Sequence, residues 1–150
     1  MTVSIDLEHP QTPDVEALLR ESHTLMQALF SPDENHFLSL DELAAENVRL
    51  FIARVEGNAA GSGALMIASD YGEVKSLYTH RDFRGCGVAD AVLTRLETEA
   101  RTLGLAVLRL ETGDLLHEAQ RLYNRHGFVE RGPFGDYEDN DASVFLEKQL

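Results

Sequence analysis

Apolar residues recur at helical spacing near the start of the chain. Thr12 precedes Pro13, and proline is favoured at the first position of a helix. From Pro13 a mostly apolar stripe predicts a helix that ends near Phe30; its members are Val15, Leu18, Leu19, Ser22, Met26 and Leu29. Such a stripe is typical of a helix that packs one face against a core.

A second helical segment is short. Ser39 and Glu42 match a capping box, in which each side chain bonds the backbone N–H of the other residue. Leu38 and Leu43 flank this pair and can form a hydrophobic staple. We therefore predict a short helix at residues 40–46.

Three extended runs follow, at residues 48–56, 59–69 and 73–80. The turns between them, at 57–58 and 70–72, are short, and each contains a glycine together with Asn or Asp. Short turns of this kind join strands that pair with each other, so we expect neighbouring antiparallel strands.

The rest of the chain alternates between helical and extended segments. The pattern predicts helices at 88–103 and 116–126, and strands at 105–111, 128–131 and 143–148. A helix that connects the strands at 73–80 and 105–111 makes a βαβ unit, whose strands are parallel. We predict an α/β (α+β) fold: a mixed, mostly antiparallel sheet flanked by about four helices.

Composition fits one domain over residues 1–150. A chain of 150 residues with 43% apolar content buries roughly 68–70% of its unfolded surface in one core. We find no secretory signal and no apolar run near the ~18 residues of a membrane span, so we expect a cytoplasmic protein. A net charge of −13 argues against a nucleic acid or a membrane as partner.

Candidate chemistry begins with the segment Arg84-Gly85-Cys86-Gly87-Val88-Ala89. Here a predicted strand enters a glycine-containing turn that opens a helix. The first amides of a helix lack intrahelical partners, and the macrodipole adds positive charge there, so this geometry suits a phosphate. The single cysteine, Cys86, permits no intramolecular disulfide, and the histidines show no metal-ligand spacing, so no metal site is expected.

The spacing of residues in this segment distinguishes three kinds of phosphate ligand. A nucleoside triphosphate loop needs Lys and Ser or Thr where this chain has Val88-Ala89. A dinucleotide fingerprint finds two of its glycines, and Glu111 could serve as the ribose-binding acid, but Asp90 occupies the third glycine position. The pattern Arg-x-x-Gly-x-Ala at 84–89 resembles the acyl-CoA pyrophosphate loop of the GNAT superfamily of N-acetyltransferases.

A second motif strengthens this resemblance. Leu122-Tyr123-Asn-Arg-His-Gly127-Phe128 is similar to the Leu-Tyr-x-x-x-Gly-Phe motif of the same superfamily, in the same order along the chain. The resemblance runs from about Glu73 to Phe128, and more loosely to the C-terminus. It implies an acetyl-CoA-dependent N-acetyltransferase that acts by direct transfer in a ternary complex.

The resemblance also implies which residues hold acetyl-CoA, the co-substrate. The loop of Arg84, Gly85, Cys86, Gly87, Val88 and Ala89 would bind the pyrophosphate. The strand residues Leu77, Tyr78 and Thr79 would pair with the pantetheine arm. The backbone N–H of Leu77 could polarise the thioester carbonyl, a contribution of ~2.7–4 kcal/mol. The family often has Asn where this chain has Leu116, so that side-chain contact is not expected.

Two side chains are candidate catalysts. An alkylamine has a pKa of about 10.4, so a base must take its proton at neutral pH. Glu73 lies eleven residues before Arg84, the offset of the general base in histone-acetylating relatives. The resemblance therefore implies that Glu73 would take the proton, directly or through water. In an ideal strand Glu73 shares a face with Lys75 and Leu77. Tyr123 matches the tyrosine that protonates the CoA sulfur.

The acceptor is expected to be a small or peptidyl primary amine, consistent with the acidic surface. Segments 22–40 and 132–143, with Tyr137 and the acidic residues 136–141, would build its pocket. Two other functions remain open: a non-catalytic acyl-CoA-binding regulatory module, which needs neither Glu73 nor Tyr123, and a dinucleotide-binding domain. The resemblance alone suggests a homodimer.

Overall fold

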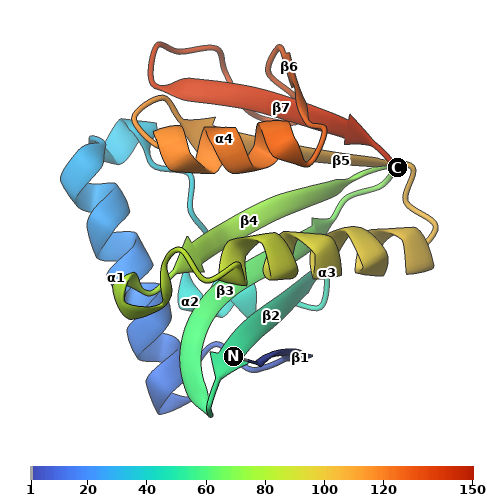
Figure 1. Ribbon diagram of the computed structural model, residues 1–150. Helices are drawn as coiled ribbons and strands as arrows, with labels where there is room; N and C mark the ends of the chain where they lie inside the picture. The colour runs from blue at the N-terminus through green and yellow to red at the C-terminus, as the bar shows by residue number, and fades with distance from the viewer. Residues whose placement is uncertain (1) are drawn as a thin grey trace.

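Seven strands form one sheet in the order β1-β2-β3-β4-β5-β7-β6 in the computed structural model, which describes residues 2–150 (Figure 1). The β4–β5 pair is parallel and the other neighbours are antiparallel, which confirms the predicted mixed sheet. The strands are β1 (Val3–Leu7), β2 (Val48–Val55), β3 (Asn58–Ile67), β4 (Gly72–Thr79), β5 (Val107–Gly113), β6 (Val129–Arg131) and β7 (Ser143–Gln149).

Helices cover both faces of the sheet. The elements are α1 (Pro13–Leu29), α2 (Leu40–Leu43), α3 (Val88–Thr102), α4 (His117–Arg125) and the 3₁₀ turns η1 (Pro32–Glu34) and η2 (Arg81–Phe83). The main core lies between the sheet and α3 with α4, and a smaller core lies beneath α1 and α2 on the opposite face. The number of helices matches the prediction. The predicted capping box at Ser39 and Glu42 is present, but α2 ends earlier than residue 46.

The sequence pattern missed β1. This strand pairs with β2 from Val3↔Val55 to Leu7↔Phe51 and forms one edge of the sheet. Its three alternating apolar residues are too few to separate from an irregular segment, and Leu7 is 52% exposed. Among the described residues, no helix combines the length and hydrophobicity needed to cross a membrane.

Strand β4 carries an irregularity that shapes the middle of the sheet. Against β3, Ala64 pairs with Lys75 but Ser62 pairs with Tyr78, so β4 has one extra residue between these pairs. Ser76 lies at this extra position and has a φ of 54°, in the left-handed region. Such a bulge bends the strand and redirects the side chains that follow it.

Candidate functional site

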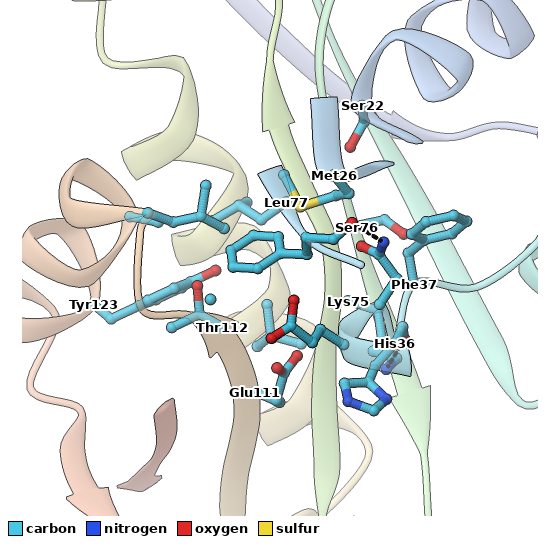
Figure 2. Close-up of a pocket in the computed structure, with 17 residues that line it drawn as sticks. Ser22, Met26, His36, Phe37, Lys75, Ser76, Leu77, Glu111, Thr112 and Tyr123 are labelled. Carbon is cyan, nitrogen blue, oxygen red and sulfur yellow. Dashed lines mark hydrogen bonds between the residues drawn. The ribbon is translucent and has the colours of Figure 1, made fainter. Parts of the chain in front are cut away.

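The parallel strands at the centre of the sheet soon separate. The β4–β5 ladder comprises Gly72↔Leu108 and Glu73↔Arg109 and then ends, and the two strands diverge (Figure 1). A cavity of about 110 Å³ lies at this divergence. Its lining includes Ser22, Met26, Phe30 and His36 from the α1 side, Lys75, Ser76 and Leu77 from β4, Glu111 and Thr112 from β5, and Tyr123 from α4 (Figure 2).

The bulge determines how β4 meets this cavity. Ser62 Oγ donates a hydrogen bond of 2.7 Å to the Ser76 carbonyl, which holds the bulge in place. Beyond it, the Leu77 side chain packs on the α3 face, near Val92 and Leu96. The prediction that Leu77 shares a face with Glu73 is therefore wrong, because the extra residue reverses the alternation.

The glycine turn has the backbone that the sequence suggested. Gly85 and Gly87 have φ values of 76° and 80°, and Gly87 is the N-cap of α3. Open space surrounds the position of an added Cβ at both glycines. These conformations favour glycine, and the first amides of α3 have no acceptor within the helix. Val88 is buried in the core, while Cys86 is exposed.

The arginines near this turn are held by the protein in different ways. Arg84 Nε donates to the Thr79 carbonyl at 3.2 Å, so this side chain folds back along the end of β4. Arg125 lies 3.2 Å from Asp90, in the first turn of α3, and His126 lies 2.9 Å from the same carboxylate. Hydrogen bonds from His126 and then Arg125 lower the pKa of Asp90.

Tyr123 enters the cavity from α4. Its side chain is 5% exposed, and its ring packs edge-on against Phe128. Burial, followed by the charge of Glu111, raises the pKa of the Tyr123 phenol. In Figure 2 the phenol points toward the interior of the cavity. The structure thus brings Tyr123 and Leu77, which the sequence predicted to act together, to one cavity.

Glu73 lies in a different environment. It is 2% exposed, and its carboxylate accepts a hydrogen bond from the Tyr137 hydroxyl and forms an ion pair of 3.2 Å with Lys75. Lys75 Nζ also donates to the Tyr137 oxygen at 2.7 Å and to the His36 carbonyl at 2.9 Å. Burial, followed by the charge of Glu73, raises the pKa of Tyr137.

Glu73 and Tyr137 line a second, wider groove of about 680 Å³. The two spaces share Glu34, His36 and Phe37 as lining residues. Both segments expected at an acceptor pocket, 22–40 and 132–143, contribute to these spaces. The groove is strongly acidic; its carboxylates belong to Asp33, Glu34, Glu42, Glu73, Asp136, Glu138 and Asp139.

Sequence reasoning placed Tyr137 at the acceptor pocket but missed the long-range contacts of this region. Lys75 and Tyr137 contact across 62 positions, and Ser143 bonds Glu111 across 32. No local spacing reveals such pairs. Glu111 carries a sequence signal, because it is an acid at the end of a predicted apolar strand, but its spacing from the glycine turn suggests only a ribose ligand. Among residues 2–150, His, Cys, Asp and Glu side chains form no group of three that could hold a metal ion.

Comparison with known proteins identifies the family. The acetyltransferase (GNAT) family matches residues 13–128, which include the divergent strands, the glycine turn and Tyr123. This chain belongs to the GNAT acetyltransferases. It is 39% identical to the IAA acetyltransferase of Azospirillum brasilense over 99% of this chain and 98% of the relative. It is also 35% identical to the uncharacterized N-acetyltransferase YsnE of Bacillus subtilis over 88% of this chain and 90% of the relative.

Solved structures agree with this assignment. A Klebsiella pneumoniae protein classed with the acyl-CoA N-acyltransferases superposes with a TM-score of 0.83 at 30% identity, and covers 99% of this chain and 97% of its own. A GNAT acetyltransferase from Elizabethkingia anophelis, solved with acetyl-CoA bound, has the same fold at 17% identity, with a TM-score of 0.70 over 99% of this chain and 98% of its own. The protein is thus an acetyltransferase of this family, and neither the dinucleotide-binding nor the non-catalytic alternative is favoured.

Proposed function

We propose that this enzyme transfers the acetyl group of acetyl-CoA to a primary amine by direct attack within a ternary complex. The observation that carries the proposal is the cavity at the β4–β5 divergence, which the β4 bulge lines on one side and the Tyr123 phenol on the other. An acceptor can approach from the acidic groove that adjoins this cavity. That groove favours an amine that arrives as a cation.

In this proposal the backbone of the open β4 edge and the glycine turn bind the donor. Leu77, Tyr78 and Thr79 hold the pantetheine arm, and the amides of the turn, from Arg84 through Gly85, Cys86, Gly87 and Val88 to Ala89, hold the pyrophosphate. The support is structural: β4 has no ladder partner on its β5 side beyond Glu73, and α3 begins at the turn. Acetyl-CoA is a polyanion, and in this proposal the local backbone amides let this acidic protein bind it.

Four groups of the protein take part in the transfer reaction. The Leu77 N–H polarises the thioester carbonyl as the amine nitrogen forms its bond to the carbonyl carbon and the carbon–sulfur bond breaks. Glu73 is the final acceptor of the amine proton, which reaches it through the Tyr137 hydroxyl or water because the carboxylate is buried. Tyr123 donates its phenolic proton to the departing thiolate.

The test is an acceptor panel with acetyl-CoA, followed by thiol release and by the mass of the product. The panel contains 1,4-diaminobutane, a peptide with a free N-terminus, and IAA, which the Azospirillum relative is named for. We expect a primary amine to accelerate thiol release and to gain one acetyl group per thiol released. Faster thiol release with IAA, and none with any amine of the panel, would contradict the amine proposal.

The remaining expectations stay predictions. We expect a single domain over residues 1–150 from the composition, a cytoplasmic location from the sequence pattern, and a homodimer from the family resemblance alone. Size-exclusion chromatography with light scattering gives the oligomeric state directly. A monomer at micromolar concentration would contradict the dimer and leave the transfer chemistry unaffected.

A further inference from the structure

Glu111 is a carboxylate in the cavity that the transfer chemistry above does not use. It lies on β5, partly buried, and its carboxylate points into the cavity in Figure 2. Ser143 Oγ donates to Glu111 Oε2 at 2.7 Å, and Asn140 Nδ2 donates to Ser143 Oγ at 3.0 Å. This chain of hydrogen bonds fixes one carboxylate oxygen and leaves the other to face the cavity.

Glu111 lacks the cation that other buried glutamates have. Lys75 lies 3.2 Å from Glu73, and Lys148 lies 2.9 Å from Glu97. Within the described part of the chain, residues 2–150, no Lys, Arg or His nitrogen lies within 4.0 Å of the Glu111 carboxylate. Burying a carboxylate without a cation is costly, so such a group is retained where it serves a ligand or a reaction.

The electrostatics of Glu111 agree with this geometry. Burial raises its pKa, and the nearby Glu73 charge adds to the increase. The Ser143 hydrogen bond and the more distant charges of His36 and Lys75 oppose the increase without cancelling it. A cation beside the free oxygen would offset the cost of burial.

We propose that Glu111 binds the acceptor as its ammonium ion, with Ser143 as a positioning residue, at a point beside Tyr123 and the bulge of β4. The proposal rests on the proposed amine acetylation and adds its substrate class, a protonated primary amine. Glu111 and Glu73 then have separate roles. Glu111 binds the cation. Glu73, already paired with Lys75, takes one ammonium proton before the neutral nitrogen attacks. The second proton leaves the nitrogen as the amide forms and restores the Tyr123 phenol, which has protonated the thiolate.

A ligand-binding experiment tests the proposed Glu111 site without any catalytic turnover. The probe is n-butylammonium chloride, titrated into the CoA-saturated protein and followed by amide NMR shifts, with 1-butanol as the neutral counterpart. We expect saturable shifts near Thr112 and Gly113 with the ammonium, and affinity at least tenfold weaker in Glu111→Gln. Asp114→Asn removes a charge at the same strand end outside the cavity lining and is expected to bind like the wild type.

Three outcomes overturn the proposal: no saturable ammonium binding, equal affinity in wild type and Glu111→Gln, or equal weakening in Asp114→Asn. Kinetics supply a second readout with any amine that the panel identifies. Glu111→Gln is expected to raise KM at least tenfold with a smaller loss in kcat, and Ser143→Ala to raise KM less. Ammonium binding without turnover on any amine would instead refute the proposed function and keep the Glu111 site.

Discussion

Tyr123 combines a buried ring with a proton to donate. Its raised pKa keeps the phenol protonated through the pH range in which the enzyme would work. Tyr123→Phe removes the hydroxyl and preserves the packing on Phe128. We expect kcat to fall about 10²-fold, the low end for a lost general acid, with nearly unchanged acetyl-CoA affinity by calorimetry. An unchanged kcat would remove the acid role.

Glu73 is predicted to act as a base although its carboxylate is already bonded. Glu73→Gln keeps a hydrogen-bond acceptor for Tyr137 and Lys75 but cannot take up a proton. We expect kcat to fall about 10²-fold, because the amine proton loses its acceptor. The measurement is steady-state kinetics of both proteins with the amine that the panel identifies. An unchanged kcat would mean that water carries the proton away without Glu73.

Glu111 should lower the free energy of unfolding at pH values at which its carboxyl is ionised. Its pKa is raised in the folded state, so its contribution is fully present below the unfolded value of about 4.3 and is lost as pH rises through the folded value. We therefore expect Glu111→Gln to raise Tm at pH 7 by about 2–4 °C. The gain should shrink as pH falls toward 4. A lower Tm of Glu111→Gln at pH 7 would show that contacts in the folded protein already offset the cost of burying the Glu111 carboxylate.

Among the elements, β4 connects packing to chemistry. One extra residue turns Leu77 onto the α3 face while the backbone beside it lines the cavity. Ser76 adopts a left-handed conformation that is unfavourable for a side chain, and the bond from Ser62 offsets part of that cost. The bulge therefore depends on a hydroxyl from the neighbouring strand β3.

Ser62→Ala tests this dependence. Ser62 is fully buried, so its removal leaves the Ser76 carbonyl without its partner and should cost about 1 kcal/mol in the free energy of unfolding. We expect kcat to fall about tenfold, which corresponds to about 1.4 kcal/mol in activation free energy. The reason is that the Leu77 N–H no longer points at the thioester carbonyl. Thr98→Ala is the matched control, since it removes a hydroxyl-to-carbonyl bond on the exposed side of α3. Equal kcat values in wild type and Ser62→Ala would contradict the role of the bulge.

Across the whole molecule, the sequence predicted what local patterns encode. Helical periodicity and caps located α1, α3 and α4 within a few residues, and short glycine turns indicated the β2–β3–β4 meander. The pattern failed where tertiary contacts decide, as in the edge strand β1 and the bulge at Ser76. A bulge arises from pairing with a partner strand, so the apolar alternation of β4 by itself does not reveal it.

The site divides in the same way. The glycine turn and the motif around Tyr123 are local, and the sequence shows both. By contrast, the Tyr137 hydroxyl that bonds Glu73 comes from the segment between β6 and β7, and the Ser143 hydroxyl that bonds Glu111 comes from the first residue of β7. Their chemistry depends on burial and on which cations are close, which one-dimensional spacing does not contain.

The central claim is that a chain with a net charge of −13 binds acetyl-CoA through the backbone at the start of α3. The most direct test is calorimetric titration of acetyl-CoA, with NAD beside it, into wild type, Gly87→Glu and Gly57→Glu. Both glycines have positive φ and open surroundings, so the two variants carry similar backbone strain and the same added charge. We predict acetyl-CoA binding by wild type and Gly57→Glu and none by Gly87→Glu. Retained affinity in Gly87→Glu, or binding of NAD in place of acetyl-CoA, would contradict the account.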